Sequence, residues 1–274
     1  MTTAFKPVSA LQRGLAVLSV VSKLGHARVT DVRDATGLDK ATIIRMLETL
    51  VREGYVEKHP LDGTYVVTGR TVDLGRGVGP HARLGELTGP LMEQFRNRVG
   101  WPSDFAVPDG DAMFIIETGE GSPLIMTHRP PGYRPDFLVS SLGRAYLAFC
   151  AEDEQRRVLD RISGNTVPEA EKLLRDMRRT RDLFEKIRKQ GYATTDDAYS
   201  KRLGAETILS VAVPLTDKHR VYGAVCLLFV RTSVSEEIAE RDYLPKLQTF
   251  SRRLTKQLER ERAGLPSAAL FSAE

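Results

Sequence analysis

A short segment near the start of the chain places cationic and small polar side chains together at helical spacing. Within residues 38–58, Ile43, Leu47 and Leu50 recur every three or four residues and predict one buried helical stripe. The other side of this helix presents the residues that could contact a nucleic acid, namely Lys40, Ala41, Thr42, Arg45 and Thr49. Cationic groups donate hydrogen bonds to guanine or phosphate, a hydroxyl can donate to phosphate, and a small residue permits close approach to a DNA groove.

The preceding residues predict two further helices that would position this one. Apolar spacing indicates a first helix over about residues 8–24, with Ser9 as its N-cap. Thr30 can cap a short second helix that ends at Gly37, and Asp39 is a suitable N-cap for the third. A short helix, a tight glycine-bearing turn and a longer helix form a helix-turn-helix, whose second helix lies in the major groove.

A β-hairpin is expected after the third helix. The segments GYVEK and TYVVT are rich in strand-forming residues and flank a turn that contains Pro60 and Gly63. Three helices and a hairpin describe a winged helix-turn-helix. We expect Lys58 and His59 of the wing to lie near phosphates and Arg13, which opens the first helix, to reach the DNA backbone. Winged helices also serve as protein–protein modules, so this alternative stays open.

Composition and charge are those of a globular protein. Apolar residues make up 41% and charged residues 28% of the 274 residues, without an apolar run long enough to span a membrane. Residues 1–70 contain ten Lys and Arg against seven Asp and Glu, so they hold +3 of the net charge of +4. Cys150 and Cys226 lack metal-ligand spacing, and no signal pattern precedes residue 15. A cytoplasmic protein without metal or cofactor is predicted.

The chain divides into four predicted parts and has an α+β fold class. Residues 1–68 form the winged domain, 69–90 a glycine-rich linker helix, 91–262 a larger α/β domain and 263–274 a flexible tail. Pro90 is expected to start a helix of the large domain. The strands expected there are DFAV, AMFIIE, LIMTH, ILSVAVPL and YGAVCLLFV. The helices expected around them begin at Ser140 or Ser141 and cover about 152–162, 168–190 and 235–262.

Catalytic motifs are not found in the large domain. Ser141, His128 and Asp136 could be imagined as a triad, but the G-x-S-x-G pattern of a nucleophile elbow is missing. The segment GRGVGP lacks the spacing of a phosphate-binding loop. Cys226 lies within an apolar strand, where a buried structural thiol is expected. We therefore predict no catalytic residue, with an enzyme that acts on a small carboxylate and carries an autoregulatory DNA-binding module as the alternative.

Two sets of motifs resemble one bacterial family. The segments RGLAVLSVV and VTDVRDATGLDKATIIRMLETLVREGYVEK are similar to the DNA-binding half of the IclR family of transcription regulators. In the large domain, SSLGRAYLAF, ILSVAVPL and VYGAVCLLFV resemble that family's helix start and paired strands. Ala41 departs from the family's Ser or Thr, which leaves a phosphate contact there in doubt. The resemblance implies a GAF-like effector-binding domain and a homodimer or dimer of dimers.

The resemblance also implies a ligand site in the large domain. Ser141, Gly143 and Arg144 match the start of a helix over the family's pocket, where backbone N–H groups suit a carboxylate. Other positions are carried over from the family's strands and loop or are expected from their chemistry to supply ring faces and a cation. The carried-over positions are Ser210, Cys226, Leu228 and Asp197. The possible ring faces are Phe105, Phe114 and Tyr133, and the alternative cations are Arg129 and Arg134.

A finer likeness concerns the ligand. Segments such as Trp101-Pro102-Ser103-Asp104 resemble activators of phenolic-acid degradation, for example those that respond to 3-(3-hydroxyphenyl)propionate. The sequence therefore predicts a regulator that binds an operator in double-stranded DNA and responds to a small aromatic carboxylate. If it is an activator, RNA polymerase is a further partner.

Overall fold

The computed structural model describes residues 8–74, 79–119, 133–218 and 220–263. The chain divides into two compact units, Met1–Gly79 and Pro80–Glu274. The expected strand LIMTH and the candidate ligand residue Arg129 lie outside the described residues. Within the described part, none of the helices combines the length and the apolar composition that crossing a bilayer requires.

The first unit is a winged helix-turn-helix. Helices α1 (Ser9–Leu24), α2 (Val29–Thr36) and α3 (Lys40–Arg52) precede the strands β1 (Val56–Lys58) and β2 (Tyr65–Val67). The strands pair antiparallel, with Val56 opposite Val67. The core of this unit lies among these elements and consists of Val17, Val21, Ala27, Val32, Ile43, Leu47, Val56 and Tyr65.

Two of the predicted caps are confirmed and two are wrong. Asp39 accepts a hydrogen bond from the Thr42 amide at 2.9 Å, and Gly37 ends α2 in the left-handed conformation (φ 68°), which a residue with a Cβ rarely adopts. Ser9, however, is the first helical residue of α1 and does not cap it. Helix α2 begins one residue before Thr30, where the Asp31 carboxylate accepts from the Arg28 amide at 2.7 Å.

The connector differs from the single linker helix expected over residues 69–90. Helix α4 (Arg70–Leu74) follows the wing, and α5 runs from Gly79 to Val99 with Pro90 inside it. The expectation that Pro90 starts a new helix is therefore wrong. Pro90 has no N–H to donate to the Glu86 carbonyl. Shortly before it in the helix, the Thr88 hydroxyl donates to the Leu84 carbonyl at 2.7 Å.

The second unit is built on an antiparallel five-stranded sheet with the order β4-β3-β7-β6-β5. The strands are β3 (Ser103–Asp109), β4 (Ala112–Thr118), β5 (Ala193–Thr194), β6 (Ile208–Thr216) and β7 (Val221–Val230). Buried side chains of β7 alternate between its two faces. Cys226 and Leu228 belong to one core, whereas Val225, Leu227 and Phe229 belong to the other.

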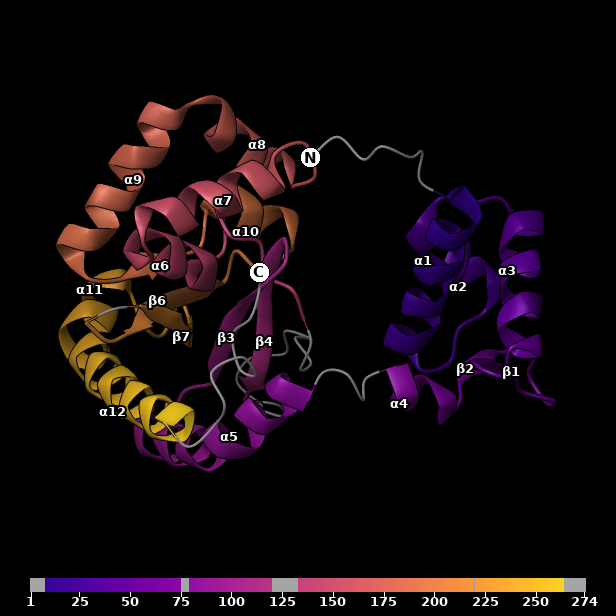
Figure 1. Ribbon diagram of the computed structural model, residues 1–274, viewed down its shortest axis with the longest axis horizontal. Coiled ribbons are helices and arrows are strands. Elements are labelled where there is room, and N and C mark those ends of the chain that lie inside the picture. Colours follow the sequence, from indigo (N-terminus) through magenta and orange to yellow (C-terminus); the bar gives the residue numbers. More distant parts are fainter. Residues whose placement is uncertain (1–7, 75–78, 120–132, 219, 264–274) are drawn as a thin grey trace. The chain divides into compact units, whose positions relative to one another are not determined.

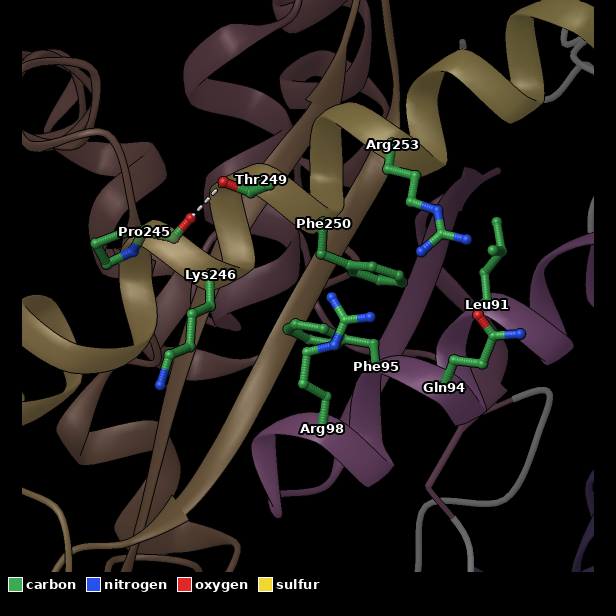
Figure 2. A pocket seen from close by; sticks show the side chains of 9 residues that line it. All are labelled: Leu91, Gln94, Phe95, Arg98, Pro245, Lys246, Thr249, Phe250 and Arg253. Atoms are coloured by element: carbon green, nitrogen blue, oxygen red, sulfur yellow. Dashed lines mark hydrogen bonds between the residues drawn. The ribbon is translucent and has the colours of Figure 1, made fainter.

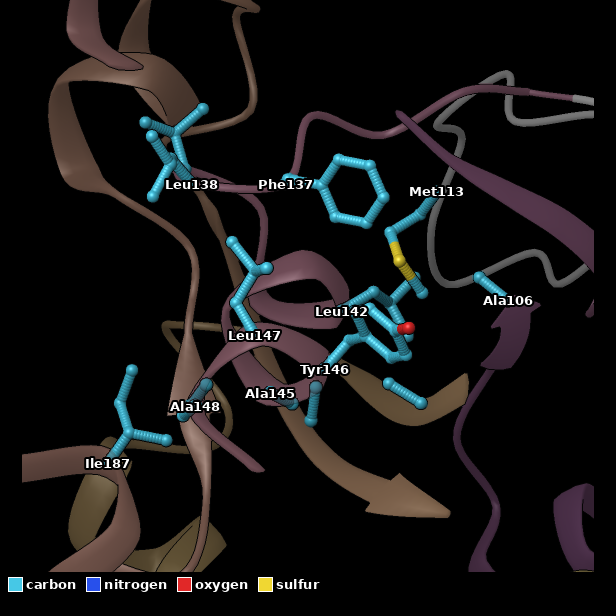
Figure 3. Packing of buried hydrophobic residues seen from close by; sticks show 14 of the residues in the cluster. Ala106, Met113, Phe137, Leu138, Leu142, Ala145, Tyr146, Leu147, Ala148 and Ile187 are labelled. Carbon is cyan, nitrogen blue, oxygen red and sulfur yellow. The ribbon is translucent and has the colours of Figure 1, made fainter. Parts of the chain in front are cut away.

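Helices cover both faces of this sheet (Figure 1). One layer consists of α6 (Ser141–Phe149), α7 (Glu152–Ile162), α8 (Pro168–Arg175) and α9 (Met177–Gln190). Tyr146, Phe137 and Leu142 fill the core beneath it (Figure 3). On the opposite face, α5 and α12 (Leu244–Ala263) cover a second core that includes Phe95, Phe229 and Phe250. Helices α10 (Asp197–Arg202) and α11 (Glu236–Ile238) are short, and a π-helical turn, Ala239–Tyr243, joins α11 to α12.

The one helix expected over residues 168–190 is two helices. Asp176 interrupts it with extended torsions (φ −119°, ψ 77°) and then caps α9 by accepting from the Arg179 amide at 3.0 Å. Thr180 fixes the break, because its buried hydroxyl donates to the Leu173 carbonyl of α8 at 2.7 Å.

Candidate DNA-binding surface and effector cavity

The N-terminal half of α3 presents an exposed cationic surface. Ile43 and Leu47 are fully buried beneath it, whereas Lys40, Ala41 and Arg45 are exposed. Lys40 and Arg45 form no salt bridge with any residue that the structure describes. The packing of α3 against α1 and α2 therefore leaves these three positions open to solvent.

The two threonines of α3 bond to their own helix. The Thr42 hydroxyl donates to the Asp39 carboxylate at 2.7 Å, and that of Thr49 donates to the Arg45 carbonyl at 2.8 Å. The hydrogen bonds from Thr42 lower the pKa of Asp39 below its ordinary value. We expected the Thr42 hydroxyl to donate to a phosphate, but in this structure it donates to the Asp39 carboxylate that caps the helix. The hydroxyl can therefore still accept a hydrogen bond but has no further hydrogen to donate.

The wing residues have partners within the hairpin. The Lys58 ammonium lies 5.8 Å from the centre of the Tyr65 ring, and His59 lies 3.1 Å from the Asp62 carboxylate. Hydrogen bonds from Thr64, and then the neighbouring His59, lower the pKa of Asp62 to about 2. Arg13 is exposed on α1. The hairpin is thereby held in shape by Asp62, while Lys58 stays exposed at its edge.

The second unit contains a cavity of about 370 Å³ at the start of α6. Hydroxyl groups surround its base: Ser141 and Ser210 share a hydrogen bond of 2.7 Å between their Oγ atoms, and the Ser141 amide donates to the Thr195 hydroxyl at 3.2 Å. The other lining residues are Tyr133, Pro135, Ser140, Leu142, Tyr199, Ser200, Leu203, Gly204, Ala205 and Ile208. No lining residue carries a formal charge at neutral pH.

The first turn of α6 lies at this cavity, which Ser140, Ser141 and Leu142 line. Ser140 caps the helix by accepting from the Gly143 amide at 3.0 Å, so α6 begins at Ser141, one of the two starting residues that the sequence predicted. Among the described residues, the Leu142 amide has no hydrogen-bond acceptor. An unpaired amide at a helix N-terminus attracts a negatively charged group.

A buried arginine holds this helix start in place. The Arg144 guanidinium donates to the carbonyls of Leu138 at 2.7 Å and Thr194 at 3.1 Å, and to the Asp196 carboxylate at 2.8 Å. Burial lowers the pKa of Arg144, which the nearby Asp196 opposes. Asp196 also caps α10 by accepting from the amides of Ala198 and Tyr199. Arg144 thus positions the cavity and does not line it.

Several expected ligand residues lie elsewhere. Phe105 is fully buried in the core on the opposite face of the sheet, and Phe114 packs against that core and stacks on His81 with ring centres 4.8 Å apart. Asp197 is exposed and pairs with Arg231 at 3.1 Å. For these three residues the expectation that they line the cavity is wrong. Their side chains point to the far core or to solvent.

Of the three strand residues expected at the ligand site, only one lines the cavity. Ser210 lines the cavity, and Leu228 lies opposite it in the β6–β7 ladder. Cys226 and Leu228 belong to the core beneath α6 and do not line the cavity. Burial of both side chains supports a packing role behind the cavity wall.

Gly143 also has a packing role. A Cβ added there would lie 2.4 Å from the Cα atom of Phe137 and 2.5 Å from the Asp136 carbonyl oxygen. Only a glycine permits this close approach between α6 and the preceding turn. Gly143 is therefore required by the fold around the cavity and is not itself a lining residue.

Most of the lining residues were not found from the sequence, and three of them carry hydroxyl groups that the ligand site would need. Thr195, Tyr199 and Ser200 come from the loop and short helix around Asp196. Burial, followed by the neighbouring Tyr133 hydroxyl, raises the pKa of Tyr199. The segment from Asp196 to Ser200 has the form of a helix start, but only the pairing of β5 with β6 brings it beneath α6.

Comparison with known proteins then establishes the family. Residues 10–60 match the model of the IclR helix-turn-helix domain, and residues 80–256 match that of the bacterial transcriptional regulator IclR C-terminal domain. The chain belongs to the IclR family. Its two matched regions correspond to the winged unit and to the unit that contains the cavity.

Curated relatives and solved structures agree with this assignment. The chain is 22% identical over 252 residues to the HTH-type transcriptional regulator XynR of Escherichia coli, covering 92% of this chain and 97% of the relative. It is 25% identical over 255 residues to the Pca regulon regulatory protein of Pseudomonas putida, covering 92% and 84%. An IclR homologue from Microbacterium hydrocarbonoxydans, solved in complex with 4-hydroxybenzoate, has the same fold with a TM-score of 0.64 at 19% identity, covering 92% of this chain and all, 100%, of that one.

This IclR-family protein is accordingly a ligand-responsive, DNA-binding transcription regulator. The named relatives are regulators, and the alternative of an enzyme with an autoregulatory module has no support among them. The described residues also contain no group of three side chains suited to hold a metal ion.

Replacement of Gly143 tests its packing role. Gly143→Ala should destabilise the second unit by about 3 kcal/mol or more, since the added methyl group overlaps backbone atoms that cannot move away easily. Urea unfolding measures this loss. Gly85→Ala in α5 is the matched control, because its added Cβ meets nothing closer than 3.7 Å and should leave stability equal or slightly higher. Equal stability of the two variants would contradict the packing role.

Proposed function

We propose that the N-terminal half of α3 enters the major groove of an operator, with Lys40, Ala41 and Arg45 nearest the bases. The observation that supports this most strongly is the exposure of these three side chains above a filled core. Glu48 and Arg52 follow on the same helix, and the negative charge of Glu48 opposes phosphate contact at the far end. Contact through the first half of the recognition helix is the usual geometry of this motif.

The wing and α1 complete the proposed surface. Lys58 and Arg13 are exposed cations suited to phosphate contacts, which add affinity but little sequence discrimination. His59 would contribute only while its ring is not held by Asp62. Thr42 and Thr49 support the helix through the hydrogen bonds described above, and each keeps one acceptor position for DNA.

Replacement of one guanidinium tests base contact. Arg45→Ala should weaken specific operator binding by about 1–3 kcal/mol if the side chain donates to a base edge. Arg52→Ala, at the other end of α3, should have a smaller effect, since Arg52 is exposed beside Glu53. Fluorescence anisotropy with a labelled operator measures both. If the wild type and Arg45→Ala bound the operator with equal affinity, the proposal that Arg45 of α3 contacts bases in the major groove would be contradicted.

We further propose that the cavity at α6 binds a small aromatic carboxylate. The carboxylate would accept from the free Leu142 amide, and the helix dipole would stabilise its charge. Tyr133, Tyr199 and Ile208 supply apolar walls for a ring, and the hydroxyls of Ser141 and Ser210 suit a phenolic group. The volume of about 370 Å³ lies at the lower end of the range for small-molecule sites.

Two of the similar proteins support the proposal of an aromatic ligand by analogy with this chain. One structural neighbour was solved with 4-hydroxybenzoate, and one relative is named for the Pca regulon. We propose that this chain controls genes of aromatic-compound catabolism, and that it acts as an activator that contacts RNA polymerase. Both points rest on the resemblance to activators of phenolic-acid degradation.

Dimerisation is proposed on the exposed apolar face of α1. Leu11 and Leu15 are 62% and 57% exposed, and Val8 is also exposed, one turn before Leu11 on the same face. A stripe of this kind in a small unit favours association with a second copy. Two copies would place two recognition helices on two half-sites and multiply the specificity of one small domain.

Ligand-dependent stabilisation tests the cavity. At about 100 times its dissociation constant, 4-hydroxybenzoate or 3-(3-hydroxyphenyl)propionate should stabilise the protein by about 2.7 kcal/mol and raise its Tm. Ser210→Val should reduce the shift, because it removes the hydroxyl pair with Ser141 and fills space in the cavity. Ser233→Val, at an exposed position after β7, is the control. A Tm shift that is the same in both variants would place the ligand elsewhere.

A further inference from the structure

A second cavity, of about 360 Å³, lies between α5 and α12 (Figure 2). Its apolar side chains are Leu91, Phe95 and Phe250, and its cations are Arg98, Lys246 and Arg253. Both helices pack on the face of the sheet that lies away from α6. The cavity is therefore separate from the proposed effector site.

The base of this cavity is a pair of stacked rings. Phe95 and Phe250 lie parallel with their centres 4.1 Å apart, and both are nearly buried, at 5% and 6% exposure. Figure 2 shows the Arg98 side chain extending from α5 and the Arg253 side chain from α12, and both residues line the same cavity as the rings. An apolar surface thus ends at two guanidinium groups on opposite helices.

The charges around the rings are not balanced within the cavity. No Asp or Glu lines it. Neighbouring arginines do have partners: Arg96 pairs with Glu117 at 2.7 Å, and Arg241 pairs with Asp242. Arg98 and Arg253, in contrast, have no carboxylate within salt-bridge distance in the part of the chain that the structure describes. Two like charges that face one groove repel each other, and an anion bound between them removes that repulsion.

Lys246 differs from the two arginines. Its ammonium lies 5.0 Å from the centre of the Tyr243 ring, and in Figure 2 it points away from the Phe95–Phe250 pair. The anion site is consequently set by Arg98 and Arg253, and Lys246 marks the other end of the groove. A planar guanidinium can hold a carboxylate or sulfonate through two parallel hydrogen bonds.

We propose that this groove binds a small organic anion with an apolar body, as a second ligand site of the protein. The anionic group would lie between Arg98 and Arg253, and the apolar part would cover Leu91 and the edges of the two rings. Symmetric pairing with a second copy is disfavoured, because it would bring the same cations face to face. A DNA phosphate would use the cations but leave the apolar base without a partner.

The position of the groove gives its occupant a route to regulation. Arg98 and Phe95 belong to α5, which begins at Gly79, where the chain passes from the first unit to the second. An anion that bridges α5 to α12 would fix α5 against the sheet. This proposal goes beyond the effector site proposed at α6, and it does not depend on whether a ligand binds there.

The test uses 8-anilinonaphthalene-1-sulfonate, a fluorescent anion with an aromatic body, titrated into the full-length protein. We expect saturable binding of one probe per chain, with affinity that falls as salt is raised. The double variant Arg98→Gln/Arg253→Gln should bind the probe about tenfold more weakly for each guanidinium removed. Lys256→Gln/Arg260→Gln is the matched control, since it removes the same charge from exposed positions of α12 outside the cavity.

Five outcomes decide the proposal. Loss of probe binding in the first variant but not in the control supports it. Undiminished binding in the first variant overturns it, as does equal affinity for the neutral analogue N-phenyl-1-naphthylamine. Binding that is lost in Ser210→Val instead places the probe in the effector cavity and also overturns it. A change of oligomeric state in the first variant, measured by sedimentation, would make the groove an interface and overturn the ligand site.

Discussion

The architecture of the second unit, which contains the α6 cavity, depends on one buried arginine. The Arg144 guanidinium joins three segments that are far apart in the sequence: the turn that contains Leu138, strand β5 at Thr194, and the start of α10 at Asp196. A buried guanidinium must have all its donors satisfied, so these segments are fixed relative to α6. Many of the groups that line the α6 cavity come from α6, from these segments and from the adjacent strand β6, whereas Tyr133, Pro135 and residues 203–205 come from the chain beside them.

The cavity follows from this constraint. Gly143 allows α6 to lie against the backbone of Asp136 and Phe137, and Ser140 caps the helix without using the Leu142 amide. A donor of the first helical turn is thereby left for a ligand in a site lined by uncharged side chains. The first unit follows the same principle. The core beneath α3 is filled by apolar side chains, so Lys40 and Arg45 are exposed and can contact a partner.

The local patterns of the sequence predicted most of the helices and strands. The residues that line the cavity were harder to predict, because they depend on pairing between strands that are far apart in the sequence. The caps at Gly37 and Asp39 depend on neighbouring residues and were predictable. Phe105 was assigned to the wrong face because its side depends on register: it pairs with Val225, not with Cys226, and so points into the opposite core. The same limit explains the choice of Asp197, since Asp196, one residue away, is the partner of Arg144.

The site residues that were missed share a physical reason. Thr195 and Tyr199 reach the cavity only because the two-residue strand β5 pairs with β6, and so short a strand leaves little periodicity in the sequence. Pro90 inside α5 was misplaced for a different reason. A proline commonly starts a helix, but α5 continues through Pro90, and its buried side chains Met92 and Phe95 pack into the core on the sheet.

The central claim is that a metabolite in the α6 cavity changes the affinity of the winged unit for DNA. It is tested most directly by anisotropy titrations of wild-type protein with a DNA fragment selected for tight binding, with and without saturating 4-hydroxybenzoate. The account predicts a change in affinity of about 5-fold or more, in either direction, as coupling between two ligand sites typically produces. Identical affinities, under conditions where calorimetry shows the ligand bound, would contradict it.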